Sequence, residues 1–145
     1  MSHTPITAGS AAFKRINRAM VFGGFSTFAL LYCVQPLMPL LARDFRLSAA
    51  QSSLALSVAT GALAVSLLVS SVLSERYGRK PLMAASMFAG GVLTFLAAFA
   101  QNYPQLLLLR FLLGLLLGGM PALAMAYLSE EIEGPSLGHS MGLYI

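Results

Sequence analysis

The stretch Ser71-Val-Leu-Ser-Glu-Arg-Tyr-Gly-Arg-Lys-Pro81 gathers charged residues into a short interval between two long apolar runs. These runs cover residues 49–73 and 82–100, and neither contains a charged side chain. As a helix, each run is long enough to cross the roughly 30 Å hydrocarbon core of a bilayer at about 1.5 Å per residue. The stretch therefore predicts a tight charged turn between two membrane-spanning helices, with Gly78 supplying backbone freedom at the bend.

The composition indicates a lipid environment for the chain. Of its 145 residues, 57% are hydrophobic and 10% are charged, whereas ordinary soluble domains carry about 25% charged residues. Apart from Arg110, the charges lie in short intervals between the apolar runs. The net charge of +4 comes from basic residues beside those runs, so we interpret it as a signal of how the helices are oriented in the membrane. We expect a lipid bilayer as partner and no nucleic acid.

Two further apolar runs complete the predicted membrane helices. They cover residues 19–41 and 105–128, and a fifth helix is expected to start near Ser140. We predict an all-α membrane protein with four transmembrane helices and the start of a fifth. Residues 1–18 are expected to form a cytoplasmic tail, disordered in its first part, and residues 19–145 a partial transmembrane bundle.

Two kinds of sequence signal indicate how these helices begin and pack. Ser48 and Gln51 have the spacing of a capping box at the start of the second helix. Small residues at four-residue spacing let helix backbones approach closely, which favours helix association in lipid. The small residues expected on packing faces are Ser53, Ser57 and Gly61; Ser86, Gly90, Thr94 and Ala98; and Gly114, Gly118, Ala122 and Ala126.

Basic residues near the helix ends predict the orientation, because they accumulate on the cytoplasmic side. Six of them flank one side of the predicted bundle and two flank the other. The N-terminus and the 74–81 turn are therefore expected in the cytoplasm. The six are Lys14, Arg15, Arg18, Arg76, Arg79 and Lys80, and the two are Arg43 and Arg46.

The charged turn resembles motif A of the major facilitator superfamily, G-x-L-[SA]-D-R-x-G-R-[RK], with Ser71 and Glu75 as departures. The matching residues are Leu73, Ser74, Arg76, Gly78, Arg79 and Lys80. The resemblance implies the first part of a twelve-helix fold and a gating role for the turn. Glu75 would cap a helix in the second half of the transporter, and Arg79 would pair with Glu130 or Glu131. The alternative is a solvated charge cluster worth less than about 1 kcal/mol.

Arg110 is the second signal, because it lies roughly six residues, or about 9 Å, inside the fourth predicted span. It shares a helix face with Gly114 and Gly118, so we expect it to point into protein and not into lipid. The stretch from Arg110 to Gly119 resembles motif B of the same family, R-x-x-x-G-x-x-x-[GA], whose arginine is linked to proton coupling. Leu113 stands where that family often has glutamine. The alternative is that Arg110 extends back to the near interface.

The resemblance also implies candidate substrate contacts and a class of transporter. The first and fourth helices of the family line a central cavity, which makes Tyr32 and Gln35 candidates, with ordinary helix packing as the alternative. The stretches 27–36, 127–132 and 140–145 resemble bacterial inner-membrane transporters of the family, a group linked to drug or sugar efflux.

These signals predict transport of a small molecule by alternating access, in the form of proton-coupled efflux, with the substrate, protons and the remaining transporter helices as partners. No metal-ligand cluster and no nucleophile–base set is visible in the sequence, so we predict no metal, no cofactor and no enzyme activity. Two alternatives stay open. One is a truncated, non-functional fragment. The other is a small oligomeric four-helix membrane protein, which would need a membrane-embedded carboxylate that the first span lacks.

Overall fold

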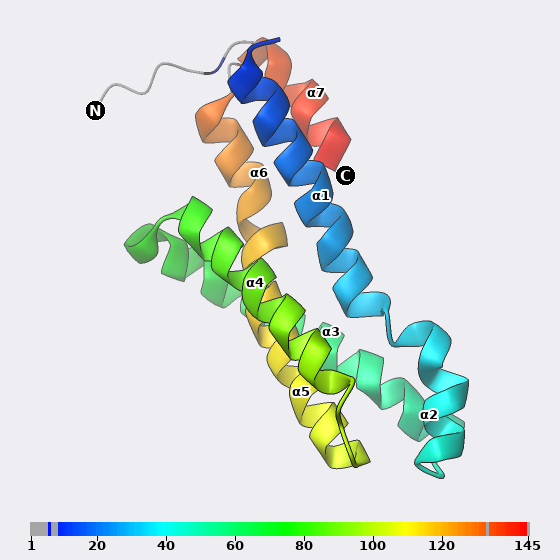
Figure 1. The fold of residues 1–145 in the computed structure, drawn as a ribbon. Helices are drawn as coiled ribbons and strands as arrows, with labels where there is room; N and C mark the ends of the chain where they lie inside the picture. Colours follow the sequence, from blue (N-terminus) through cyan, green and yellow to red (C-terminus); the bar gives the residue numbers. More distant parts are fainter. Residues whose placement is uncertain (1–5, 7–8, 133, 145) are drawn as a thin grey trace.

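The computed structural model describes residues 6, 9–132 and 134–144, and these residues form a helical bundle (Figure 1). Apart from a single bridge between Ile6 and Ile132, the regular structure of the described residues is helical. The elements in chain order are α1 (Ala11–Tyr32), the 3-10 helix η1 (Gln35–Leu37), α2 (Met38–Asp44), α3 (Ala49–Tyr77), α4 (Arg79–Ala97), α5 (Tyr103–Leu117), α6 (Gly119–Glu131) and α7 (Gly134–Tyr144).

Four helical stretches are long and apolar enough to cross a membrane, which confirms the predicted fold class. They are residues 11–44, 49–77, 79–97 and 103–131. Large apolar side chains cover much of the outer surface: Leu68 is 76% exposed and Phe88 is 77% exposed. An outward-facing apolar surface of this kind suits lipid as the surrounding solvent.

The helix boundaries differ from the predicted spans at both ends of the chain. α1 begins at Ala11 and not at residue 19, because the Ser10 side chain accepts a hydrogen bond from the Phe13 amide and so caps a helix that starts before the apolar run. Part of the predicted 1–18 tail is therefore helical, while residues 1–5 and 7–8 lie outside the described residues. α7 begins at Gly134, earlier than the expected start near Ser140.

The first membrane-spanning stretch is interrupted after α1, about two thirds of the way along residues 11–44. α1 ends at Tyr32, and the chain passes through η1 into α2, which turns away from the α1 axis (Figure 1). Pro36 has no backbone N–H and cannot donate to the carbonyl four residues earlier, and Pro39 follows in the first turn of α2. The two prolines therefore explain why this stretch bends.

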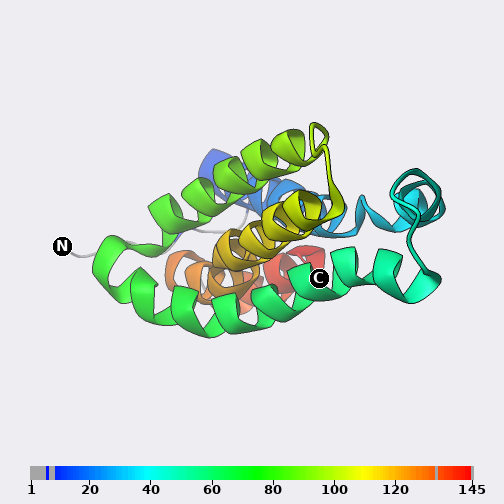
Figure 2. The ribbon, with the colours of Figure 1, turned by 90° about the horizontal axis from the view of Figure 1, so that it is seen from below.

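α3 and α5 form the tightest helix pair, and Figure 2 shows α5 lying between α3 and α4. A Cβ atom added to Gly114 would overlap the Ala59 carbonyl oxygen, and one added to Gly118 would overlap the Ser66 side chain. The Ser66 hydroxyl also donates to the Leu115 carbonyl. The absence of side chains at these two glycines lets the helix backbones come into contact.

The prediction of the packing face was correct for Gly114 and Gly118, which are buried at α5, whereas Ala122 and Ala126 of α6 are half-buried. The prediction was wrong for α3. Ser53, Ser57 and Gly61 are exposed on the structure. α3 carries small residues on several faces, so four-residue spacing alone did not identify the face that packs. The buried residues of α3 are Ser52, Ala55, Ala59, Ala62, Ser66, Ser70 and Ser74.

We expect Gly114→Ala to destabilise the bundle by about 1–3 kcal/mol, because the added methyl group would force α3 and α5 apart. Gly61→Ala is the matched control, since a Cβ there meets nothing within 4 Å and alanine favours the helix. Thermal unfolding in detergent, followed by circular dichroism, measures the difference. Equal melting temperatures for the Gly114 variant and the parent would show that the α3–α5 contact is not as described.

Candidate functional site

Arg110 is the most deeply buried charged side chain among the described residues, with 2% of its surface exposed. It lies on the face of α5 that carries Leu113, Gly114 and Leu117, all of them buried. This face contacts α3 and α4. The guanidinium is therefore enclosed by helices and does not extend back to the interface.

The guanidinium of Arg110 donates to backbone carbonyls on two other helices. Its Nη1 lies 3.1 Å from the Leu30 oxygen, and its Nη2 donates to the Leu31 oxygen. Its Nε lies 3.2 Å from the Ala55 oxygen of α3. The thiol of Cys33 completes the surroundings at 3.8 Å from Nη1. One side chain thus connects α1, α3 and α5.

The carbonyls on α1 are available because the helix stops there. Among the described residues, no backbone N–H is recorded as donating to the Leu30 or Leu31 oxygen, since α1 ends at Tyr32 and the chain then turns. Unpaired carbonyls at a helix end favour a nearby cation. Arg110 therefore supplies hydrogen bonds to two carbonyls at the end of α1.

The magnitudes favour this arrangement over an unpaired charge. An arginine at membrane depth costs about 2.5–3.5 kcal/mol on insertion scales. Each hydrogen bond from a charged group contributes about 1.5–3 kcal/mol, so three such bonds offset the penalty. Among the described residues, no carboxylate forms an ion pair with Arg110.

The α3–α4 turn reverses the chain through one residue. Gly78 has φ 84° and ψ 152°, a conformation that side chains disfavour, and it ends α3 and precedes α4. Its amide donates to the Ser74 carbonyl at 2.9 Å. The Arg76 guanidinium lies 5.7 Å from the centre of the Tyr77 ring. Glu75 and Lys80 are exposed on either side of the bend.

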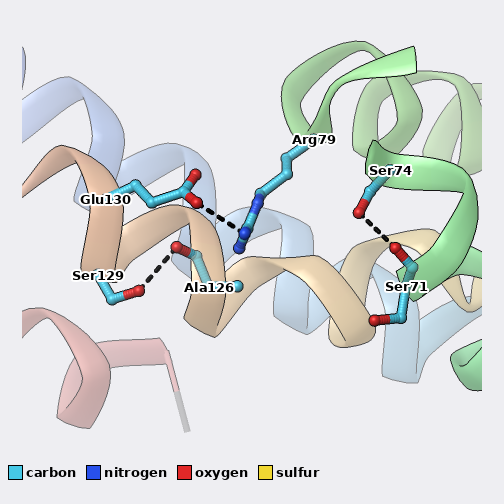
Figure 3. A network of polar contacts seen from close by, with 6 residues as sticks. All are labelled: Ser71, Ser74, Arg79, Ala126, Ser129 and Glu130. Atoms are coloured by element: carbon cyan, nitrogen blue, oxygen red, sulfur yellow. Dashed lines mark hydrogen bonds and ion pairs between the residues drawn. The ribbon is translucent and has the colours of Figure 1, made fainter. Parts of the chain in front are cut away.

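Arg79 connects this turn to the end of α6 (Figure 3). Its Nη2 lies 2.6 Å from Oε1 of Glu130, with 30% and 58% of the two side chains exposed. Of the two acids that the resemblance offered, the structure brings Glu130 to Arg79, while Glu131 lines a cavity of about 720 Å³ between α1, α4 and α6. An ion pair this exposed contributes about 1 kcal/mol or less.

Tyr32 and Gln35 lie on the outer surface at the break after α1, and both are exposed. The Tyr32 ring stacks on Phe28, with centroids 6.2 Å apart and an interplanar angle of 15°. Neither residue lines the cavity between α1, α4 and α6. The structure therefore places them next to the Arg110 contacts in the chain but does not gather them with that side chain into a pocket.

Sequence reasoning did not identify the partners of Arg110. The partners are main-chain carbonyls at Leu30, Leu31 and Ala55, and a carbonyl has no residue-type signature. One indirect signal is present in the sequence: Pro36 lies inside an apolar run, and a proline there leaves a carbonyl of the preceding turn without its usual N–H donor.

Comparison with known proteins agrees with the helical membrane architecture. The "Uncharacterized MFS-type transporter YybF" of Bacillus subtilis is 51% identical over 98% of this chain, and the match covers 35% of that protein. The "Inner membrane transport protein YnfM" of Escherichia coli is 43% identical over 97% of this chain and 34% of that protein. The chain thus spans about a third of the length of these relatives. No solved structure matches.

A family model also matches the chain, in agreement with the individual relatives. The model of the Major Facilitator Superfamily matches residues 20–145, which include the four membrane-spanning stretches almost entirely. The relatives named above are transporters by name and cover nearly the whole chain. The resemblance inferred from the α3–α4 turn and from Arg110 is confirmed at the level of the family. The chain belongs to the Major Facilitator Superfamily.

Proposed function

We propose that this chain forms the opening part of a transporter that moves a small molecule across a bacterial inner membrane by alternating access. The N-terminus and the α3–α4 turn lie in the cytoplasm in this proposal, as the distribution of basic residues favours. The observation that carries the proposal is that Arg110 donates hydrogen bonds to the Leu30 and Leu31 carbonyls, where α1 ends. Irregular backbone at membrane depth is tolerated where it is buried in protein or lines a cavity, and transporters place their binding sites at such breaks.

We further propose that transport is proton-coupled efflux of the drug or sugar type. Arginine stays charged, so Arg110 itself does not carry the proton. It can, however, exchange partners: an ionised carboxylate binds a guanidinium more strongly than a carbonyl does, and a protonated one does not. The described membrane-spanning stretches carry no Asp or Glu at the depth of Arg110, so that carboxylate would belong to the remaining transporter helices.

The charged turn supplies the second element of the proposal. Breaking the Arg79–Glu130 pair costs little because both side chains are partly exposed. A weak pair is suited to a contact that opens and closes in each transport cycle. Glu75 and Arg76 are exposed beside it, where the other half of the transporter would contact them. Tyr32 and Gln35 remain candidate substrate contacts in this proposal.

Two other functions compete with this one. A small oligomeric four-helix exporter would carry its own membrane-embedded carboxylate, and the described spans give it none. A non-functional fragment is distinguished by transport itself. A panel of fluorescent drugs and labelled sugars, followed in cells that express either the 145-residue chain or the complete transporter, separates the two. We expect export only from the complete transporter.

Arg110→Ala is expected to lower proton-driven transport in the complete transporter at least tenfold, because the carbonyls of Leu30, Leu31 and Ala55 lose the guanidinium that joins them. Arg43→Ala is the control, since Arg43 is exposed and its ion pair among the described residues is with its neighbour Asp44. Initial export rates with and without an imposed pH gradient provide the measurement. Unchanged rates in the Arg110 variant would remove the basis of the coupling proposal.

Exchanging the charges of the Arg79–Glu130 pair tests the gate. Arg79→Glu and Glu130→Arg should each reduce transport severalfold, and the double exchange should restore most of it because the attraction returns. Arg79→Glu combined with Glu131→Arg is the matched control and should not recover, because the structure records the pair with Glu130. Recovery in the control but not in the first pair would assign the contact to Glu131.

A further inference from the structure

The side of α1 that faces α7 carries polar features that the proposed transport role does not use. A groove with a volume of about 460 Å³ lies between the first two turns of α1 and the second half of α7. Among the described residues, no carboxylate lines it, although Glu130 and Glu131 lie at the neighbouring end of α6. The lining residues are Phe13, Lys14, Asn17, Arg18, His139 and Leu143.

Asn17 gives the groove an unused hydrogen-bonding group. Its side chain is 6% exposed, and neither the carboxamide oxygen nor the nitrogen has a hydrogen-bond partner among the described residues. Buried amides without partners are rare because their desolvation is not repaid. The hydroxyl of Ser140, beside His139 on α7, is buried and unpartnered in the same way. The contact between α1 and α7 therefore contains buried polar groups that a polar ligand could pair with.

Two cations border the same groove. Lys14 and Arg18 are exposed and one helical turn apart. The Arg18 Nε donates to the Lys14 carbonyl at 3.3 Å, which holds the guanidinium beside the lysine. Arg15 lies instead in the larger cavity that Glu131 also lines. The groove toward α7 is therefore positively charged, and its ligand should be an anion.

The position of the groove along the helix favours one source for that anion. Lys14 and Arg18 directly precede the uncharged stretch that begins at Ala19, which places them at the depth of the lipid headgroups. Leu143 lines the groove on the membrane side of the charges, because its neighbour Tyr144 packs beside Gly24, beyond Arg18 on α1. Phe13 lines it on the other side of Lys14. A phospholipid matches this arrangement, because its phosphate suits the two cations and its hydrocarbon chains suit the apolar lining. Basic residues at the membrane surface also attract anionic lipids.

We propose that the α1–α7 groove binds the headgroup of an anionic phospholipid, with Lys14 and Arg18 holding the phosphate and Asn17 donating to it. This site differs from the Arg110 cluster and from the charged turn, and it does not depend on the proposed transport function. Binding there would join α1 to α7 through the lipid.

The test uses the purified chain in detergent and titrates it with dioleoylphosphatidylglycerol, with dioleoylphosphatidylcholine as the zwitterionic comparison. Native mass spectrometry measures bound lipid, and circular dichroism measures the melting temperature. We expect the anionic lipid to bind at least tenfold more tightly. Lys14→Gln with Arg18→Gln should weaken that binding about 30-fold, which corresponds to about 2 kcal/mol at about 1 kcal/mol per basic residue.

Two controls separate a site from general charge attraction. Arg15→Gln with Lys80→Gln removes the same charge from the larger cavity between α1, α4 and α6 and should change binding less than threefold. Asn17→Leu should melt in phosphatidylcholine at or above the temperature of the parent, because it removes an unpaired buried amide. It should nevertheless weaken phosphatidylglycerol binding about tenfold, which a role in packing alone would not do.

Three outcomes would overturn the proposal. Equal losses in the two double variants would reduce the effect to surface charge. Unchanged phosphatidylglycerol binding by Asn17→Leu would show that the Asn17 amide does not contact the lipid. A rise in melting temperature with inorganic phosphate as large as that with phosphatidylglycerol would show that the groove takes a free anion and not a lipid.

Discussion

The arrangement of the helices depends on one buried guanidinium. A permanently charged side chain at membrane depth is tolerated when protein acceptors pair with its N–H donors. Arg110 finds its acceptors on α1 and α3, at Leu30, Leu31 and Ala55. The acceptors on α1 exist because that helix ends at Tyr32. The break in α1 and the burial of Arg110 therefore depend on each other. The break alone would leave carbonyls unpaired in a lipid environment, and the buried arginine alone would leave its N–H groups unpaired.

The same constraint explains why glycine is needed on α5. Arg110 reaches the Ala55 carbonyl only if α5 lies against α3, and Gly114, one turn further on, contacts the Ala59 carbonyl one turn further along α3. The two helices thus run in the same direction with matching turns in contact. Gly118 continues the contact at Ser66. The small residues set the distance between the backbones, and the arginine uses that distance to reach a carbonyl.

Sequence patterns predicted the membrane helices, the capping box at Ser48 and the family, because each depends on residue types at fixed spacing. Three features escaped prediction for physical reasons. Hydropathy marks where lipid begins, whereas α1 begins where Ser10 caps free amides. Four-residue spacing on α3 fitted several faces, and Ser53 and Ser57 proved exposed. The partners of Arg110 are backbone atoms, whose availability depends on where another helix ends.

The contacts of different strength suggest which parts of the bundle move together. α3 and α5 are joined along their length by glycine contacts, by the Ser66 bond to Leu115 and by the Tyr103 hydroxyl, which donates to the Gln51 carbonyl. α1 meets this pair sparsely, through Arg110 and through the buried Leu31, and diverges from it toward α6 and α7 (Figure 1). The Arg79–Glu130 pair is weaker again because it is partly exposed. Separating α3 from α5 would break packed backbone contacts along both helices. Releasing α1 requires Arg110 to change partners and Leu31 to leave its small cluster with Ala59, Leu113 and Leu117. A rearrangement of this bundle would therefore shift α1 against a rigid α3–α5 pair.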